Sequence, residues 1–561
     1  MKLFSRLARQ LLGITISLLI PCAWLPGQST DRQIGTQVTA TADPKVPRPH
    51  ERPCVVSLFS GYTFAHFADT TQTFNFAPPA NCPGPWKEVV LDIDFSENAG
   101  TQFDRTASLY LANANLYFGT TPEPLPTAAN SWHVERDLSD YSALLSMAQQ
   151  GAMVLQNCTS DCGAPYNTLN GVFTVNAKLE FYPASRGAAV RSTPDEVLPL
   201  VQSNGNGGVN LPAFLFTPTD QFSTTFTLPT NIERAYLDVV SQSQSTDEQW
   251  YACFPNDLSS INELFGCGNT DFRETEVAID GQPAGIAPVS PWVYTGFLPD
   301  QWVPTPAAQT LDFVPYRVNL TPFAGLLGNG QAHTISLSVF NDDSYFSEAA
   351  SLLLFLDADS TQVTGAVTRN TLTAPNPIVT ENLQGTATVT GTIKVAQQRN
   401  FTIEGYVQTS HGRVKTSVSE WQDFSSTQTI DFDTVNFTVL NQDTDVRNSV
   451  LSTTTVSSRE GTTVANESFS FPIKLNVVYP VSAAPFGLTV ATAQNYNANR
   501  LLWSNARAVD FASVTNSVSA TDVSPAASSQ RYTFFGSSAP TYDCRIASAN
   551  NTLTAVGRGC K

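Results

Sequence analysis

The sequence predicts an all-β protein, built as two jelly-roll or β-sandwich domains that are followed by a further β-rich domain. Short segments alternate apolar and polar residues with a period of two, as in Glu88–Phe95 and Ala107–Ala112, which is the pattern of half-buried strands. Clusters of Gly, Pro and Asn separate these segments, and the clearest helical candidate is short, at Tyr141–Gln149. Many short strands with regular turns favour a sandwich or jelly roll over an α/β fold.

The length of the chain, 561 residues, is too great for a single core. An Ala-, Arg- and Ser-rich link at Ser185–Thr193 separates the two jelly rolls, and the Thr-, Ala- and Pro-rich Thr371–Pro377 opens the third region. We expect a signal peptide at 1–29, a flexible leader at 30–50, jelly-roll domains at 51–185 and 186–365, and a β-rich domain at 366–561.

The composition limits the kinds of partner. Hydrophobic residues make up 42% of the chain, which is ample for packed cores, whereas charged residues make up only 14%. The formal net charge of -18 argues against nucleic acid and anionic membranes as partners. A chain with few charges also has few ion-paired carboxylates to lose in acid, so we expect the fold to tolerate low pH.

The N-terminus has the features of an export signal. Lys2, Arg6 and Arg9 precede an apolar run, Leu11–Leu25, and small residues follow at 27–29. Pro21 and Pro26 make the run too short for a good membrane span. We therefore expect a secreted or periplasmic protein that is monomeric and not bound to a membrane after signal removal.

Cysteine usage agrees with export. Eight cysteines remain after the signal, and they fall in sequence-local pairs. Eight cysteines allow 105 pairings, so locality alone favours the expected connectivity. A metal site is the competing interpretation, but no C-x-x-C with partner histidines occurs, and we expect neither a metal nor a cofactor. The expected disulfides are Cys54–Cys82, Cys158–Cys162, Cys253–Cys267 and Cys544–Cys560.

The segment Gly100–Arg105 is the most informative for chemistry when it is interpreted as the start of a strand. Alternate residues from Phe103 onward form an apolar side that should face the core. Arg105, at the mouth of that side, would need a carboxylate partner. Asp104 points to the opposite side, where a cleft between domains would lie. A surface aspartate beside a structural arginine is the competing interpretation.

Two further segments contain candidate substrate-binding residues. In Trp132–Tyr141, Trp132 is either structural or a ligand contact, and Glu135 is either a cap and ion-pair partner or a ligand contact. The second segment is a loop before Cys253 that combines two carboxylates with two aromatic rings. Aromatic faces stack on sugar rings and carboxylates accept hydroxyl hydrogens, so a sugar site and a plain solvated loop both remain open. The four loop residues are Asp247, Glu248, Trp250 and Tyr251.

The segment Phe272–Gly281 supplies further carboxylates. Val277 and Ile279 mark a core-facing side, which places Glu274 on the opposite side, and Asp280-Gly281 is a hairpin signal. Downstream, Trp292 and Tyr294 are either core residues or platforms for a ligand. The chain has no G-x-S-x-G, Walker or H-E-x-x-H motif and only five histidines, so any catalysis should rest on carboxylates.

These motifs together resemble the plant and fungal peptide-N-glycanase A amidases, and the low charge and short signal are most similar to the acidic bacterial members. The resemblance covers nearly all of the exported chain. It is carried by Cys82-Pro83, Trp86, Val89–Leu91, Gln102–Arg105, Glu123-Pro124, Trp132, Glu135, Asp137, Tyr141, Glu248–Tyr251, Phe272–Glu274, Asp280-Gly281, Tyr294–Gly296 and Phe401–Val414.

A local similarity to the flavobacterial F-type glycanases implies a catalytic role for Asp104, which matches the catalytic Asp of their Asp-Arg pair. Their second carboxylate position holds Asn269 here, so Glu248 or Glu274 would have to take that role. A further acidic position of that family is replaced, by Asn157. The resemblance places Arg105 or Arg273 as the donor to a developing oxyanion.

The activity that the resemblance implies is hydrolysis of the side-chain amide that joins an N-glycan to asparagine, at acidic pH. The products would be an aspartyl peptide and a glycosylamine that then sheds ammonia, and the partners would be N-glycosylated peptides or glycoproteins. Two alternatives remain open. A glycoside hydrolase also uses paired carboxylates on β-sandwiches but leaves the asparagine intact, and a non-catalytic glycan-binding surface protein would bind without turnover.

Overall fold

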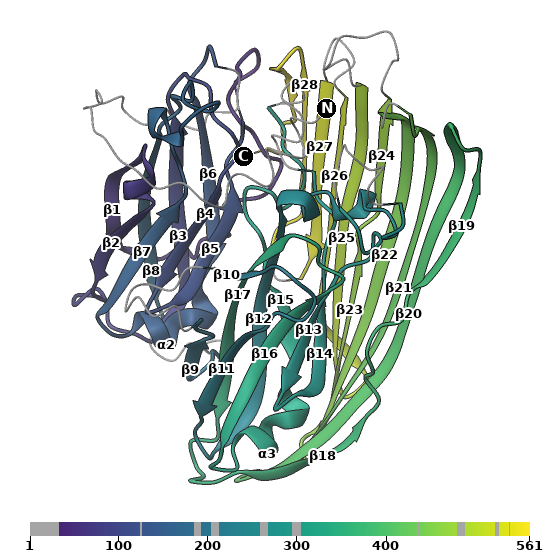
Figure 1. Cartoon of the computed structure of the whole chain (residues 1–561). Helices are drawn as coiled ribbons and strands as arrows, with labels where there is room; N and C mark the ends of the chain where they lie inside the picture. Colours follow the sequence, from purple (N-terminus) through teal and green to yellow (C-terminus); the bar gives the residue numbers. More distant parts are fainter. Residues whose placement is uncertain are drawn as a thin grey trace.

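The computed structural model describes residues 33–123, 126–184, 192–202, 212–258, 267–293, 304–435, 438–478, 489–521, 527–537 and 539–560. Strands dominate these residues, and every helix among them is a single turn. The prediction of an all-β fold is confirmed. Figure 1 shows a first sandwich, a second sandwich and a broad C-terminal sheet, which follow one another along the chain.

The first sandwich consists of two four-stranded antiparallel sheets. One sheet has the order β1 (Cys54–Phe64), β8 (Phe173–Pro183), β3 (Trp86–Glu97), β6 (Asn130–Asp137). The other has the order β2 (Thr71–Phe76), β7 (Gln149–Leu155), β4 (Thr106–Leu111), β5 (Ala114–Thr120). Apolar residues at alternate positions of both sheets share one core, as the period-two pattern predicts.

The second sandwich is also antiparallel. One sheet has the order β10 (Ala213–Leu215), β17 (Tyr345–Leu356), β12 (Ile232–Gln244), β15 (Tyr316–Asn319), and β9 (Glu196–Pro199) also pairs with β17. The other has the order β11 (Phe222–Thr227), β16 (Ala332–Phe340), β13 (Glu274–Ile279), β14 (Gln282–Pro288). The predicted Asp280-Gly281 hairpin joins β13 to β14, and both turn residues have positive φ, as a type I′ turn requires.

The C-terminal region forms one twelve-stranded antiparallel sheet. Its main path is β18 (Thr364–Asn370), β20 (Thr388–Thr409), β21 (Gly412–Asp433), β22 (Thr438–Ser458), β23 (Gly461–Ser470), β25 (Thr489–Ser504), β26 (Arg507–Thr521), β27 (Ala527–Gly536), β28 (Tyr542–Ala549), β29 (Thr552–Val556). Two short strands pair beside this path, namely β19 (Ile378–Gln384) and β24 (Ile473–Val478).

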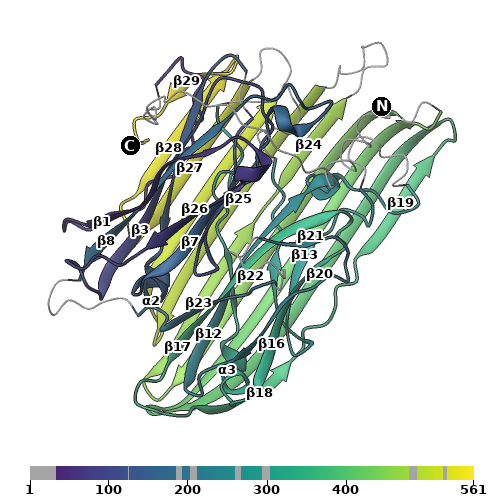
Figure 2. The same ribbon diagram turned by 60° about the vertical axis from the view of Figure 1, so that its left-hand side comes forward.

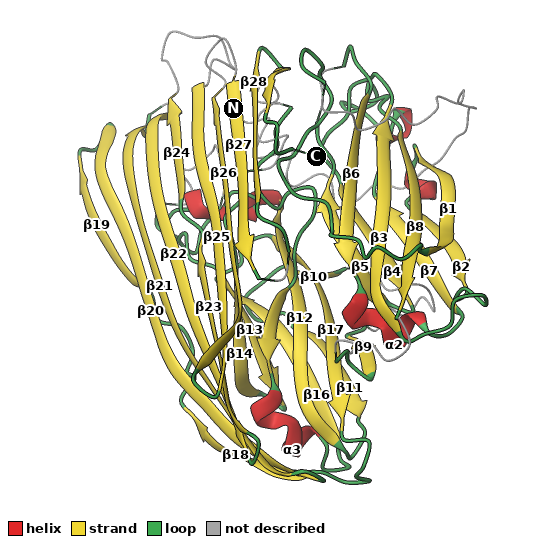
Figure 3. Ribbon diagram, turned by 180° about the vertical axis from the view of Figure 1, so that it is seen from behind, coloured by secondary structure: helices red, strands yellow, loops and turns green. Residues whose placement is uncertain are grey.

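One face of the C-terminal sheet packs on the second sandwich. Their apolar side chains form a single buried cluster, and the Phe424 ring of β21 lies 5.0 Å from Phe272 and 6.2 Å from Trp250. Figure 2 shows the long strands of this sheet running past the second sandwich, and Figure 3 shows the same arrangement from behind. The sheet therefore supports the segments of the second sandwich that hold candidate site residues.

The short helices occupy connections between strands. They are η1 (Phe67–Asp69), η2 (Ser139–Tyr141), α2 (Ser142–Leu145), η3 (Ser160–Cys162), η4 (Ser245–Asp247), η5 (Trp250–Ala252), η7 (Thr321–Phe323) and α3 (Ala324–Leu327). The helix expected at Tyr141–Gln149 is shorter in the structure, because β7 begins at Gln149 and places Met153 and Leu155 in the core of the first sandwich.

The four predicted disulfides are confirmed. The structure joins Cys54 to Cys82, Cys158 to Cys162, Cys253 to Cys267 and Cys544 to Cys560. No helix in the ranges given above is long and apolar enough to cross a membrane. The expected signal peptide lies outside the described residues.

Residues 33–50, which we expected to form a flexible leader, pack between the first sandwich and the last strands of the C-terminal sheet. The Gly35 N–H donates to the Leu553 carbonyl of β29 at 2.7 Å. The Thr39 N–H donates to the Asn130 side chain of β6 at 2.8 Å. The first bond connects the beginning and the end of the described chain, and the second ties the segment to the first sandwich. The composition of this segment does not reveal this, because its partners are distant in sequence.

Candidate active site

Asp104 and Arg105 lie immediately before β4, at the end of its sheet. The strand begins at Thr106, and Ala107 faces the core of the first sandwich as predicted. Thr106 lies on the other side and meets the second sandwich, where its hydroxyl accepts a hydrogen bond from Gln244 Nε2 at 2.7 Å. Asp104 is therefore next to the interface between the two sandwiches, on the side that the strand pattern predicts.

A further carboxyl, that of Glu123, reaches Asp104 through the β4–β5 hairpin. Just beyond β5, the Thr121 N–H donates to the Arg105 carbonyl, and the Arg105 N–H donates to the Thr121 hydroxyl, both at 2.8 Å. Glu123 follows two residues later, and its carboxylate accepts the backbone N–H of Asp104. The sequence places Glu123 only in the Glu123-Pro124 match to the family, which does not mark it as a site residue.

Glu248 comes to the same place from the second sandwich. It follows β12, whose last residue Gln244 contacts Thr106, and the turn η4. Its neighbour Asp247 holds the loop, because Asp247 Oδ2 accepts the backbone N–H groups of Asp343 at 2.6 Å and Ser344 at 2.8 Å. The negative charges of Asp104 and Glu123 both act on the Glu248 carboxyl.

The three carboxyls differ in their proton affinity. Burial raises the pKa of Asp104 to about 6, and the Arg105 charge limits this rise. Burial and then the charge of Asp104 raise the pKa of Glu123 well above its ordinary value, and the same two causes act on the pKa of Glu248. The carboxyls disfavour one another's ionisation, and Arg105 directly adjoins Asp104. A single negative charge in this group is therefore best placed on Asp104, which leaves the protons on the other two carboxyls.

Tyr345 completes this group. It is the first residue of β17 and lies opposite Gln244 in the β12–β17 ladder. Burial, followed by the charges of Glu248 and Asp104, raises the pKa of Tyr345 to about 12. The phenol is thus a neutral hydrogen-bonding group beside the carboxyls.

Arg105 retains one unused hydrogen-bond donor. Its Nη2 donates to Gln102 Oε1 at 2.6 Å and lies 3.7 Å from Cys158 Sγ. Its Nε is buried and has no hydrogen-bond partner among the described residues. The centre of the guanidinium lies 5.6 Å from the Phe103 ring. An arginine with a free N–H beside a carboxyl cluster is able to donate to a developing negative charge.

Arg273, the other arginine expected in the site, is fully buried and holds the Glu248 loop. Its Nε and Nη2 donate to Asp247 Oδ1 at 3.0 and 2.7 Å. Its Nη1 donates to the Thr270 carbonyl at 2.8 Å, and its Nη2 also donates to the Gly268 carbonyl at 3.2 Å. The structure therefore places Asp247 and Arg273 beneath the site, where they fix the loop and do not face a ligand.

Glu274 lies at a different interface. It begins β13, is fully buried, and its carboxylate is paired with Arg399 of β20 in the C-terminal sheet. Burial raises the pKa of Glu274 to about 8, against the lowering effect of Arg399. The structure thus brings Glu248 to Asp104 and places Glu274 against the C-terminal sheet.

The aromatic side chains expected to contact a ligand lie in the cores. Trp132 is 2% exposed, and Trp250 and Tyr251 are fully buried. Trp292 is also buried, and its carbonyl accepts a hydrogen bond from the Tyr251 hydroxyl at 2.8 Å. None of these four presents an open ring face. Trp132 is directed inward from β6, whereas Trp250 and Tyr251 are buried from the turn η5 and Trp292 from the segment after β14. Tyr294 lies outside the described residues.

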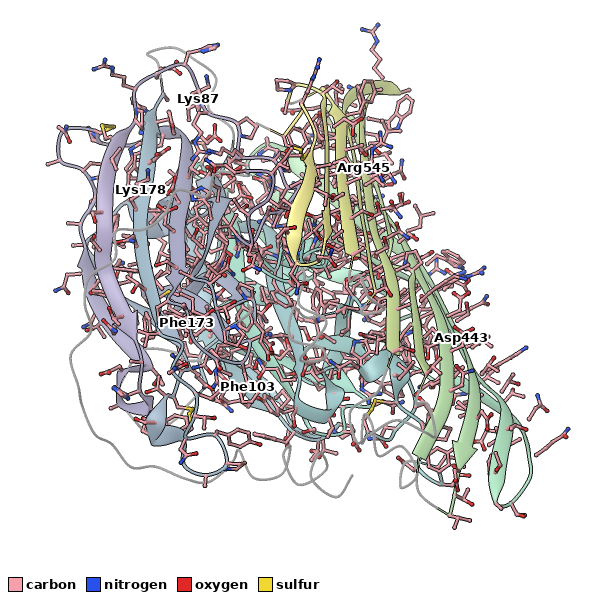
Figure 4. The ribbon with its side chains drawn as sticks, turned by 90° about the horizontal axis from the view of Figure 1, so that it is seen from above. Lys87, Phe103, Phe173, Lys178, Asp443 and Arg545 are labelled. Carbon is pink, nitrogen blue, oxygen red and sulfur yellow. A yellow bond between two sulfur atoms is a disulfide. The ribbon has the colours of Figure 1, made fainter. Side chains whose placement is uncertain are left out.

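Glu135 belongs to an ion-pair network on the outer face of the β1–β8–β3–β6 sheet. It pairs with Arg48 and lies 3.0 Å from His133 Nε2. Asp92, His133 and Glu135 are close enough to hold a metal ion. Burial lowers the pKa of His133, but hydrogen bonds to Asp94 and Glu135 outweigh it and raise that pKa to about 9. Figure 4 shows Lys178, which joins this network, and Phe103 on different sides of the first sandwich.

Two members of the site, Glu123 and Tyr345, were missed from the sequence. A signal for Glu123 exists, because a second alternating run follows Ala107–Ala112 and the two runs form a hairpin. A hairpin brings the residues before its first strand beside the residues after its second strand, so Asp104 and Glu123 meet. Tyr345 has no comparable local signal, since it depends on pairing between β12 and β17, whose contacting residues are about a hundred positions apart.

The fold and the carboxyl cluster define a β-sandwich protein with buried, interacting carboxyls between its two sandwiches. The sequence matches the family of Peptide N-acetyl-beta-D-glucosaminyl asparaginase amidase A over residues 44–371, which is more than half of the chain. The chain belongs to this family.

One relative is the Peptide-N4-(N-acetyl-beta-glucosaminyl)asparagine amidase A of Prunus dulcis, 28% identical over 385 residues. That match spans 66% of this chain and 65% of the relative, just under two thirds of its length. Among solved structures, PNGF-II matches 54% of this chain and 66% of its own, with 14% identity and a TM-score of 0.37. PNGase F from Flavobacterium meningosepticum matches 54% of this chain and 96% of its own, with 14% identity and a TM-score of 0.33.

Proposed function

We propose that this chain hydrolyses the amide bond between an N-linked glycan and an asparagine side chain, which gives an aspartyl peptide and a glycosylamine. The observation that carries the proposal is the meeting of Asp104 and Glu248 from two different sandwiches, in environments that separate their pKa values. Such a pair offers a base and an acid in one site. Family membership and the name of the almond relative support the same reaction.

In the proposed reaction, ionised Asp104 takes a proton from water while the water oxygen bonds to the amide carbon. The carbonyl electron pair moves to oxygen, and Arg105 donates to that oxyanion. As the oxyanion collapses, the C–N bond breaks and Glu248 gives its proton to the leaving nitrogen. One water is consumed. Asp104 then releases its proton to solvent, and Glu248 takes up a proton from solvent, which restores both groups to their starting state.

The decisive experiment compares three carboxyl variants on an N-glycosylated peptide. Asp104→Asn and Glu248→Gln should each lower kcat about 10²- to 10⁴-fold, which is the usual contribution of a general acid or base. Glu274→Gln should keep the rate of the folded enzyme while it lowers stability, because it removes the partner of Arg399. Mass spectrometry of the peptide is the readout.

The outcomes separate the candidate functions. Conversion of asparagine to aspartate in the released peptide supports the amidase, whereas an intact asparagine would establish a glycosidase. Full activity in Asp104→Asn would contradict its role as the base. Loss of activity in Glu274→Gln without loss of stability would transfer the role of the acid to Glu274.

We further propose that the protein is secreted or periplasmic, monomeric, and active at acidic pH on N-glycosylated peptides or glycoproteins. Four disulfides are compatible with an oxidising compartment. Raised pKa values keep Glu248 and Glu123 protonated through neutral pH. Asp104 must be ionised to act as the base, and its pKa of about 6 sets the lower end of the working range in mildly acidic solution. Detection of the mature chain outside the cytoplasm tests the export signal at 1–29.

A further inference from the structure

Three aromatic rings on the second sandwich form a cluster beside the carboxyl site. The Tyr345 ring lies 5.6 Å from that of Phe214 and 5.5 Å from that of Phe216. The Phe214 and Phe216 rings are 6.4 Å apart. Phe214 belongs to β10, which pairs with β17, and Phe216 follows that strand directly.

Phe216 turns this cluster toward solvent on a well-anchored turn. Its side chain is 40% exposed. Asp220 Oδ2 accepts the backbone N–H groups of Phe216 at 2.8 Å and Thr217 at 3.1 Å. An exposed phenylalanine on a turn held in this way retains apolar surface that a ligand is able to cover.

The cluster is connected to the acid side of the site. Tyr345 lies opposite Gln244, which is bonded to Thr106. Ser344, the residue before Tyr345, donates its N–H to Asp247, the residue before Glu248. The three rings therefore extend outward from Glu248, the carboxyl that would protonate the leaving nitrogen.

A second aromatic pair borders the base side. The Phe103 ring, next to Asp104, lies 5.7 Å from Tyr166 in an edge-to-face arrangement. Tyr166 is partly exposed and lies four residues beyond Cys162, which is tied to Cys158. The carboxyl site thus has aromatic surface on both sandwiches, with Glu248 toward one and Asp104 toward the other.

We propose that Phe214, Phe216 and Tyr345 bind the N-acetylhexosamine that is attached to the asparagine nitrogen, and that the peptide lies toward Phe103 and Tyr166. This inference rests on the proposed function. In the amide, the nitrogen carries the sugar and the carbonyl carbon carries the peptide. In the proposed reaction, Glu248 protonates the nitrogen and Asp104 activates the water that attacks the carbon. The sugar on the nitrogen therefore extends toward the second sandwich, and the peptide on the carbon extends toward the first.

The chemistry of the cluster suits this sugar. A pyranose ring has an apolar C–H face that packs on an aromatic ring, and the N-acetyl methyl adds further apolar surface. The neutral Tyr345 hydroxyl offers a hydrogen-bond partner to a sugar hydroxyl or to the acetamido group. The exposed edge of Phe216 extends this surface outward, so a disaccharide would contact it with its second sugar as well as its first.

The test uses calorimetry to measure the binding of two probes. One is free di-N-acetylchitobiose, and the other is the peptide of the activity assay without its glycan. Phe216→Ala should weaken disaccharide binding about 10-fold, which corresponds to the loss of one aromatic contact, and leave peptide binding unchanged. Tyr166→Ala should weaken peptide binding and leave disaccharide binding unchanged. Phe535→Ala serves as the matched control, because Phe535 is 59% exposed on β27 of the C-terminal sheet.

Disaccharide affinity that is unchanged in Phe216→Ala, or absent in the unsubstituted protein, would overturn the proposal. If Phe216→Ala lost peptide binding and kept disaccharide binding, the peptide and not the sugar would lie on this cluster, and the proposed orientation would be wrong. An equal loss in Phe535→Ala would show that the effect is not local. Turnover of glycopeptide by the unsubstituted protein tests the amidase separately, so a failed subsite and a failed function give different results.

Discussion

The two halves of the site use the same combination, an arginine beside a disulfide, for different purposes. In the first sandwich, Arg105 lies beside Cys158, binds a neutral glutamine, and keeps an N–H that has no partner in the described part of the chain. In the second sandwich, Arg273 lies 3.6 Å from Cys253 Sγ, and every guanidinium nitrogen donates to a buried acceptor. The first arginine keeps one donor unused, and the second is part of the scaffold.

The difference shows how an arginine is assigned a role. Adjacency to a carboxylate is common to both arginines, since Asp104 precedes Arg105 and Glu274 follows Arg273. What separates them is burial and the number of donors already used. A fully buried guanidinium must satisfy its donors within the protein, so it has none left for chemistry.

The largest effect is expected when the scaffold arginine is removed. Arg273→Gln should lower the free energy of unfolding by about 3–5 kcal/mol, because it leaves the buried carboxylate of Asp247 without its partner. Urea denaturation measures this loss. If the variant is as stable as the unsubstituted protein, the Arg273–Asp247 pair is not a structural element, and Arg273 is again a candidate for the oxyanion donor.

A smaller effect, on rate and not on stability, is expected at the other arginine. Arg105→Gln should lower kcat about 10²- to 10³-fold, the usual cost of one oxyanion donor. Because the Arg105 charge lowers the pKa of Asp104, its removal should also raise that pKa. The acid limb of the kcat/KM profile should then move to higher pH.

The pH profile separates this role from a purely structural one. A structural arginine would lower the amount of folded enzyme without moving the acid limb. The control is Arg105→Lys, which keeps the charge and should leave the limb near its original position while it loses the planar donor geometry. An unmoved limb in Arg105→Gln would contradict the electrostatic link to Asp104.

Much of the fold was predictable because it depends on local pattern. Strand alternation identified Glu88–Phe95 and Ala107–Ala112 and placed Asp104 on the non-core side. The spacing of the cysteines identified all four disulfides. These features are fixed by neighbours within a few tens of residues. Long-range pairing carries no such signal.

The candidate site was harder to predict because its members meet across the fold. The choice between Glu248 and Glu274 depends on which one faces Asp104, and this follows from sheet order and not from spacing. Trp250 and Tyr251 have the composition of a sugar site, yet the C-terminal sheet covers them. Phe216, which carries no motif, lies beside the site and keeps an exposed ring.

The smallest expected effect is on the pH dependence of stability. It concerns Asp342, a buried acid beside Arg273 in the second-sandwich half of the site. Asp342 is buried, neither of its carboxyl oxygens has a hydrogen-bond partner among the described residues, and burial followed by the charge of Asp247 raises the pKa of Asp342 from 3.8 to about 7. The folded state therefore binds this proton more tightly than the unfolded state. Its stabilising contribution is full below about pH 4 and is lost as the pH rises through about 7.

Asp342→Asn, which is neutral at every pH, should remove this part of the pH dependence. Between about pH 4 and pH 8 the variant should lose about 1–2 kcal/mol less unfolding free energy than the unsubstituted protein. The value is modest because the adjacent Asp343 is exposed, so water reaches the turn and relieves part of the cost of ionisation. Asp343→Asn is the matched control and should leave the pH dependence unchanged. If Asp342→Asn loses as much stability as the unsubstituted protein, the proton is held elsewhere, and the two halves of the site do not differ in this respect.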